Sequence, residues 1–119
     1  MRISELSAKT KVSVDRLRRY DAAGLIASQR QPNGDRDYDE EVLRQVIFIA
    51  MSREMGFSLA QVAAYLPRFK TGKLSSGEMI QAIRQRVAEV DEVIAVQKAL
   101  RKMLLSHIGW FKSKKRKTP

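Results

Sequence analysis

The chain has 119 residues, the size of one typical domain, and 44% of them are hydrophobic, which is normal for a folded protein. It contains no cysteine and one histidine, which excludes disulfides and thiolate metal sites and leaves few groups for catalysis, so we expect no enzyme. The formal net charge of +10 indicates a polyanionic partner, and nucleic acid is the first candidate.

The positive charge is concentrated in the second half of the chain. Residues 1–66 carry 10 Lys and Arg against 9 Asp and Glu, whereas residues 67–119 carry 13 against 4. If the first half binds DNA, it therefore does so through charges clustered on one face. No apolar run is long enough to span a bilayer and no signal-peptide pattern is present, so we expect a cytoplasmic protein without membrane contact.

The first 24 residues predict two short helices. Residues 2–9 form the first, and a brief turn follows at residues 10–12. Ser13 is suited to cap the second helix because its hydroxyl can accept from an otherwise unpaired backbone N–H. Gly24 is a natural end, since glycine adopts the left-handed conformation there. Two short helices joined by such a turn are a helix-turn-helix pattern.

A β-hairpin is predicted next, within residues 27–38. Asn33-Gly34 is a strong hairpin-turn signal because both residues tolerate positive φ, and Pro32 also favours a turn. A small hairpin after a helix-turn-helix is a wing.

Two further helices follow the wing. Asp39 is expected to cap the first, which ends at Gly56. Ser58 and Gln61 form a capping-box start for the second, which is expected to stop at Pro67. The residues expected to face inward on these helices are Val42, Leu43, Val46, Ile47, Phe48, Ile49, Ala50, Leu59, Val62, Ala63 and Leu66.

Residues 68–77 predict a linker loop, and residues 78–108 one long helix of roughly 45 Å, at 1.5 Å per residue. Its apolar residues recur at a spacing of three and four, which gives a stripe that a lone helix cannot bury. The stripe predicts a dimeric coiled coil, with a helix folded back on its own domain as the alternative.

Residues 109–119 predict a short basic tail, disordered at its end, with an extra phosphate contact as the alternative. Trp110 and Phe111 are expected to pack on the end of the long helix or on a partner subunit. With His107 they form either a structural cluster, which we favour, or a small effector pocket. A lone histidine is poor evidence for a metal site, so no metal or other cofactor is expected.

Three motifs resemble those of the MerR family of bacterial transcription regulators. The string V-S-V-D-R-L-R-R-Y-D-A-A-G-L at 12–25 is similar to the family's V-S-x-x-T-L-R-Y-Y-E-x-x-G-L. The wing string N-G-Y-R-x-Y corresponds to N-G-D-R-D-Y at 33–38, and R-E-x-G-F-S-L is intact at 53–59. The motifs cover residues 2–66, in the family's order.

This resemblance implies a mainly α fold, with a winged helix-turn-helix domain at residues 1–67 and a dimerisation helix that forms an antiparallel coiled coil. It further implies a homodimer on an inverted-repeat site in double-stranded DNA. Members of the family act with RNA polymerase at promoters whose −35 and −10 elements are too far apart, and they bend and untwist that DNA.

The resemblance also implies roles for single residues. Val14, Asp15, Arg16 and Arg19 lie where the recognition helix would reach base edges. Further candidates for phosphate contact and positioning are Arg18, Tyr20, Arg36 and Arg53. Tyr38 is either part of this DNA-binding set or packs the wing against the second helix.

The chain departs from the family strings at a few positions. Lys11 replaces a turn glycine, Arg19 replaces a tyrosine and Asp35 replaces the wing aromatic, which affects which operator is read. Two other functions stay open: an excisionase-like or architectural DNA binder, and a coiled-coil interaction module. Few residues follow the long helix, so we expect no separate ligand-binding domain.

Overall fold

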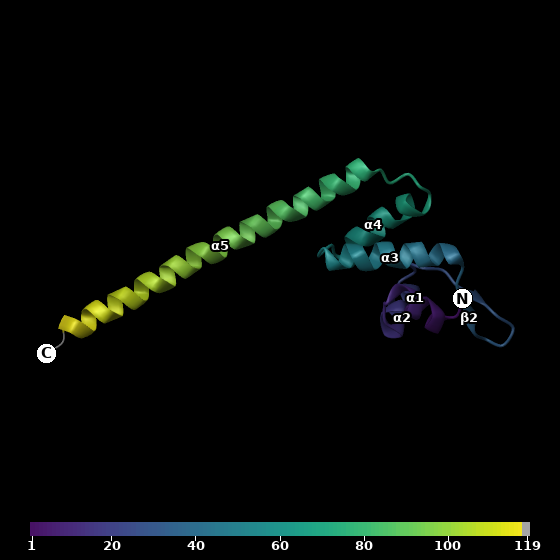
Figure 1. Cartoon of the computed structure of the whole chain (residues 1–119), viewed down its shortest axis with the longest axis horizontal. Helices are drawn as coiled ribbons and strands as arrows, with labels where there is room; N and C mark the ends of the chain where they lie inside the picture. The colour runs from purple at the N-terminus through teal and green to yellow at the C-terminus, as the bar shows by residue number, and fades with distance from the viewer. Residues whose placement is uncertain (118–119) are drawn as a thin grey trace. The chain divides into compact units, whose positions relative to one another are not determined.

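The computed structural model describes the backbone of residues 1–117 and the side chains of residues 1–114. The chain divides into two units, one formed by Met1–Met79 and a second that begins at Ile80. The first contains four helices and a two-stranded hairpin among the described residues, and the second continues one long helix (Figure 1). The prediction of a mainly α fold with a small wing and a long C-terminal helix is confirmed.

Helices α1 (Ile3–Thr10) and α2 (Val14–Ala22) form the predicted helix-turn-helix. The turn between them places Lys11 in the left-handed conformation, at φ 61°. Ser13 caps α2, because its hydroxyl accepts from the backbone N–H of Arg16 at 3.2 Å. Gly24, at φ 75°, ends the helix, and the N–H of Leu25 returns to the carbonyl of Tyr20 at 2.9 Å.

The wing consists of strands β1 (Gln29–Arg30) and β2 (Arg36–Asp37), which pair antiparallel with Arg30 opposite Arg36. In the connecting loop Gly34 has φ 87°, as predicted, whereas Asn33 does not adopt positive φ, so the turn differs from the predicted Asn-Gly pair in that respect. Beyond β2, the N–H of Tyr38 donates to the carbonyl of Met1 at 2.7 Å, which attaches the wing to the start of the chain.

Helices α3 (Glu40–Glu54) and α4 (Leu59–Lys70) pack against each other, and α3 also contacts α1 (Figure 1). The capping box of Ser58 and Gln61 is present, as predicted. Asp39 occupies the capping position of α3 with extended backbone, but its side chain makes no capping hydrogen bond, so its predicted role is wrong in that respect.

The prediction that α4 stops at Pro67 is wrong, because the helix continues to Lys70. Proline cannot donate a backbone N–H, but its carbonyl still accepts from the N–H of Thr71 at 3.2 Å. Tertiary contacts hold the extra turn. The ring of Phe69 stacks on Phe48 with centroids 4.3 Å apart, and the Lys70 ammonium donates to the carbonyl of Leu25 at 2.9 Å.

The core of the first unit draws on every one of its helices and on the wing. Its buried hydrophobic residues are Leu6, Val12, Leu17, Tyr20, Leu25, Ile26, Tyr38, Val42, Val46, Phe48, Ile49, Phe57, Val62 and Leu66. The expected inward set was too wide, because Ile47 and Leu59 are 47% and 39% exposed and Ala63 is also exposed. The inward stripes of α3 and α4 are therefore narrower than the apolar pattern suggested.

Helix α5 (Ser76–Lys117) has 42 residues and exceeds the predicted helix at both ends. It passes through Gly109, since one glycine in a helix costs only about 1 kcal/mol relative to alanine. The predicted tail is thus helical up to Lys117, and its last two residues lie outside the described part. None of the helices in the described part has both the length and the apolar character needed to cross a bilayer.

Candidate DNA-binding surface

Helix α2 presents a charged face opposite its buried one. Leu17 and Tyr20 are buried, which fixes the helix against the core. Of the four residues predicted to reach base edges, Asp15, Arg16 and Arg19 are exposed and Val14 is half-buried. The face predicted from the sequence is therefore available to a ligand.

Two of the predicted positioning residues on α2 contact neighbours one turn away. The guanidinium of Arg16 donates to the hydroxyl of Tyr20 at 2.9 Å, so the buried tyrosine orients an exposed arginine. Arg18 lies 3.9 Å from Asp15, in an exposed pair that is weak and easily exchanged for another anion.

The wing is joined to α2 through Asp21, a residue that the sequence did not single out. Its carboxylate accepts from the hydroxyls of Tyr38 at 2.6 Å and Ser28 at 3.2 Å, and it pairs with Arg36 at 2.5 Å. The available signal was its place in the motif, where the family string has an acidic residue after the second tyrosine.

This cluster shifts the pKa values of the Asp21 carboxyl and the Tyr38 phenol. Burial, with the hydrogen bond to Asp21 and its negative charge, raises the pKa of the Tyr38 phenol to about 12. Burial alone would raise the pKa of Asp21, but the hydrogen bonds from Arg36, Tyr38 and Ser28 outweigh it and hold that pKa below its usual value. Asp21 is therefore ionised at neutral pH and Tyr38 carries its proton.

A groove of about 580 Å³ lies between the start of α1, one face of α2 and the wing. Arg2, Arg18 and Arg36 line it, with Asp21 and Asp35 among its acidic residues. The structure thus brings two predicted phosphate-binding arginines to one hollow and adds Arg2, which the sequence did not indicate. Arg2 is 70% exposed and lies 3.4 Å from Asp35.

The remaining predicted arginine, Arg53, does not line this groove. It lies in the last turn of α3, where its guanidinium donates to the carbonyl of Phe57 at 2.9 Å. That bond closes the turn before α4 and leaves the exposed guanidinium further donors for an anion.

Two family models match the chain. One is described as MerR HTH family regulatory protein and matches residues 1–68, and the other is described as MerR, DNA binding and matches residues 43–107. The chain belongs to the MerR family. It is therefore a transcription regulator with a DNA-binding domain, in a family of regulators and not of enzymes.

Individual relatives agree with this membership. A probable heavy metal-dependent transcriptional regulator of Haemophilus influenzae is 34% identical over 105 residues, which are 87% of this chain and 82% of that protein. The crystal structure of the regulator PbrR691 from Ralstonia metallidurans, in complex with lead(II), is 28% identical with a TM-score of 0.72 and covers 89% of this chain and 83% of that one.

A third protein shares the fold. It is HiNmlR, a MerR family regulator lacking the sensor domain, and its crystal structure shows it bound to promoter DNA. It is 20% identical with a TM-score of 0.61, and the match covers 98% of this chain and 89% of that one.

The C-terminal residues considered for an effector lie on one exposed stretch of α5 in this MerR-family chain. His107 and Phe111 line a hollow of about 440 Å³ together with Leu104, Ile108 and Lys112, whereas Trp110 is not part of it. Trp110 instead meets Phe111 edge to face at 4.7 Å, and the Lys114 ammonium lies 4.8 Å from its ring centroid. In the part of the chain that is described, no group of three or more His, Cys, Asp or Glu residues is arranged to hold a metal ion.

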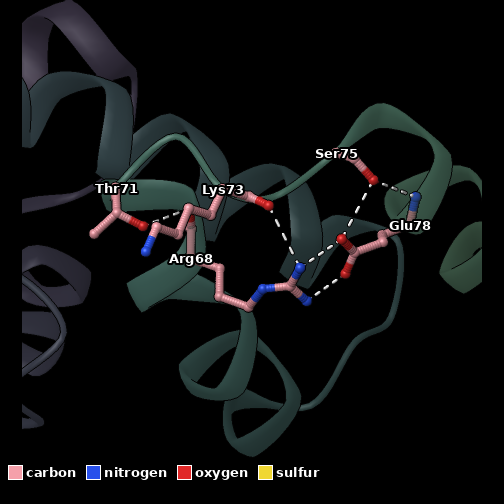
Figure 2. A network of polar contacts seen from close by, with 5 residues as sticks. All are labelled: Arg68, Thr71, Lys73, Ser75 and Glu78. Carbon is pink, nitrogen blue, oxygen red and sulfur yellow. Dashed lines mark hydrogen bonds and ion pairs between the residues drawn. The ribbon is translucent and has the colours of Figure 1, made fainter.

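A polar network joins the end of α4 to the first turn of α5 (Figure 2). The guanidinium of Arg68 binds both carboxylate oxygens of Glu78 and also donates to the carbonyl of Lys73. Ser75 caps α5, because its hydroxyl accepts from the N–H of Glu78 at 3.1 Å. The linker between α4 and α5 is therefore held by specific polar contacts. It is shorter than the predicted 68–77, because α4 ends at Lys70 and α5 begins at Ser76.

Proposed function

We propose that this MerR-family regulator acts as a homodimer on an inverted-repeat promoter site. The observation that carries the proposal is the exposed charged face of α2, which lies beside a wing whose arginine lines the same groove. Each α2 enters a major groove, and each wing braces the adjacent backbone. The two α2 helices of a dimer then read two half-sites in opposite orientation.

Within α2, side chains divide by their position. The exposed Asp15, Arg16 and Arg19, with the half-buried Val14, contact base edges. Arginine recognises guanine through two hydrogen bonds, and a carboxylate accepts from cytosine. Tyr20 acts by orienting Arg16, because its hydroxyl already accepts from that guanidinium.

Phosphate contacts come from arginines around this face. Arg18 and Arg36 line the groove beside the wing, and Arg53 stands at the end of α3. Each keeps unused guanidinium donors, which suit phosphate oxygens. Tyr38 is 1% exposed, so its contribution is to hold the wing and not to touch DNA.

Dimerisation follows from the apolar face of α5. The large apolar side chains exposed on it are Ile80, Ile83, Val87, Val90, Val93, Ile94, Val96, Leu100, Met103, Leu104, Leu105, Ile108, Trp110 and Phe111. Those from Ile80 to Leu104 include the predicted three-and-four stripe, and a second copy of α5, running antiparallel, would cover it. At the end of the helix, His107, Trp110 and Phe111 are assigned to the same packing surface, with an effector pocket as the alternative.

The regulatory step in this proposal is a deformation of the promoter. The dimer bends and untwists a spacer that is too long between the −35 and −10 elements, so that RNA polymerase engages both. The sequence has no cysteine, so the proposal contains no thiolate-bound metal, whatever metals its relatives bind.

Selection of bound duplexes from a random pool tests sequence-specific binding directly. We expect an enriched palindrome, bound with a dissociation constant on the order of 10⁻⁸ M or tighter at physiological salt. The variant Arg18→Ala/Arg36→Ala should bind more weakly, with a salt slope reduced by about 2. Its matched control, Arg84→Ala/Lys102→Ala, removes two positive charges from α5 and should keep that slope.

Failure to enrich a palindrome would remove sequence-specific regulation from the proposal. Equal affinities of the wild type and the Arg18/Arg36 variant would instead leave a coiled-coil interaction module. Footprinting and DNA-bend measurements on the selected promoter complete the test. A protected −35/−10 spacer that is bent supports the regulator, whereas binding elsewhere favours an excisionase-like or architectural protein.

A further inference from the structure

Asp21 connects the recognition helix to both ends of the wing. It lies in the last turn of α2, and its side chain is 12% exposed. Its three donors come from different parts of the hairpin: Ser28 precedes β1, Arg36 belongs to β2 and Tyr38 follows β2. One carboxylate on α2 therefore fixes the entry, the second strand and the exit of the wing.

A carboxylate suits this position because it is an acceptor-only group with two oxygens. One oxygen, Oδ2, accepts from both hydroxyls, and the other, Oδ1, binds the guanidinium of Arg36. Charge-assisted bonds of this kind are stronger than bonds between neutral groups, and they offset the loss of hydration on burial. An amide at the same place would keep one acceptor oxygen but lose the charge that holds Arg36.

Arg36 is held more firmly than the other arginines of the groove. Arg2 and Arg18 are about equally exposed, at 70% and 69%, and each lies near an exposed carboxylate at 3.4 and 3.9 Å. Arg36 is 44% exposed and is bound at 2.5 Å to a mostly buried one. The contact uses Nη1, which leaves other guanidinium donors for a phosphate.

We infer that Asp21 is a positioning residue for DNA binding, which presets the wing and Arg36 against α2 so that the backbone and base contacts form together. This inference rests on the proposed function, because it names the residue through which the wing contact is organised. The ligand is the same duplex, and Asp21 acts on it through Arg36, the phosphate contact that the wing carries. Preorganisation of this kind lowers the ordering cost of binding.

The opposite role for Asp21 predicts an opposite result. A negative charge on a DNA-binding surface repels phosphate and also competes with it for Arg36, so its removal would then strengthen binding. If Asp21 positions Arg36, removal of its charge weakens binding even though the protein becomes more positive. The sign of the change therefore separates the two roles.

The test compares Asp21→Asn with the full-length wild type on the duplex selected above. We expect the dissociation constant to rise about tenfold and the salt slope to fall by about 1, as for one lost phosphate contact. In a double-variant cycle, Asp21→Asn should add nothing to Arg36→Ala, because the contact it organises is already gone. The control Asp39→Asn removes the same charge from an exposed residue just after the wing that does not line the groove, and it should bind as tightly as the wild type or tighter.

Tyr38→Phe provides a second route, since it keeps the ring and the carboxylate but removes one donor. It should weaken binding by less than Asp21→Asn, and again only when Arg36 is present. Binding by Asp21→Asn at or above wild-type affinity, or additive effects of Asp21→Asn and Arg36→Ala, would overturn the inference and leave the proposed function intact. A wild type that selects no duplex would overturn both.

Discussion

The first unit buries most of its large apolar residues, whereas helix α5 leaves most of its large apolar residues exposed. Between Met1 and Met79 the large apolar residues mostly lie inside, and Leu6, Leu17, Val46 and Ile49 have no measurable exposure. On α5, by contrast, apolar residues from Ile80 onward stand in solvent. The first unit can therefore be stable by itself, whereas a long helix with an exposed apolar stripe, such as α5, would be stabilised by the partner proposed to cover that stripe.

Polar contacts follow the same division. In the first unit they join segments far apart in sequence, as when Tyr38 binds Asp21 or Lys70 binds the carbonyl of Leu25. On α5 beyond its first turn, by contrast, Arg86 donates to Glu89 and the Ser106 hydroxyl donates to the carbonyl of Met103, each over three residues. Long-range bonds specify one packing of the first unit, whereas local ones specify only a helix.

The largest effect is expected from a cavity in the first unit. Ile49→Ala should lower its free energy of unfolding by about 2–5 kcal/mol, because a fully buried side chain is removed from packed surroundings. Urea unfolding followed by circular dichroism measures this. The control Ile47→Ala lies on the same helix but is 47% exposed, and it should change stability far less. Similar losses for both variants would mean that a partner covers Ile47.

A charge on α5 should affect assembly without unfolding the first unit. Leu100→Glu places a carboxylate within the proposed dimer stripe and should raise the dimer dissociation constant on the order of 100-fold, or about 2.7 kcal/mol. Sedimentation equilibrium measures it. Ala95→Glu introduces the same charge on the opposite face of the helix and should leave the dimer intact. If the wild type were monomeric, the proposed dimer through α5 would be contradicted.

The sequence predicted the fold to the extent that local signals control it. Ser13, Gly24, Gly34 and the Ser58–Gln61 box act within a few residues of themselves, and each appears where it was expected. The end of α4 was misplaced because long-range contacts of Phe69 and Lys70 override the local preference of Pro67. The end of α5 was misplaced because one glycine is a weak stop signal within a long helix.

The candidate site was predictable in outline only. The exposed residues of α2 and Arg36 were identified from the pattern and the family motifs. Asp21 was not, because its importance lies in donors 7, 15 and 17 positions further along the chain, at Ser28, Arg36 and Tyr38. Pairing of this kind is decided by the hairpin fold and leaves no periodic signal.

A smaller effect is expected at the turn between α1 and α2. Lys11→Gly should stabilise the first unit by up to about 1 kcal/mol, because a residue with a Cβ is strained at φ 61° and glycine is not. Thermal unfolding measures the change. Lys9→Gly, made within α1 where the backbone is helical, should destabilise by about as much. A loss of stability in both variants would show that the flexibility of glycine outweighs the strain at Lys11.

The smallest effect is expected at the exposed pair of Arg68 and Glu78, which joins the end of α4 to the first turn of α5 within the first unit (Figure 2). The hydrogen bond from Arg68, more than any other cause, lowers the pKa of Glu78 below its ordinary value. Since that pKa is lower in the folded state than in the unfolded one, the contribution of the pair is complete above the unfolded value. It is lost as the pH falls through the folded value.

Arg68→Gln should return the pKa of Glu78 toward 4.5, the value that it would have without these partners. Carboxyl chemical shifts followed from pH 7 to pH 2 measure this, and amide exchange at Glu78 should be faster in the variant. Arg84→Gln, which changes an arginine further along α5, should move neither. Because both side chains of the pair are well exposed, the melting temperature should hardly change. An unchanged pKa of Glu78 in Arg68→Gln would mean that Ser75, which both caps the helix and donates to that carboxylate, holds the first turn of α5 without the arginine.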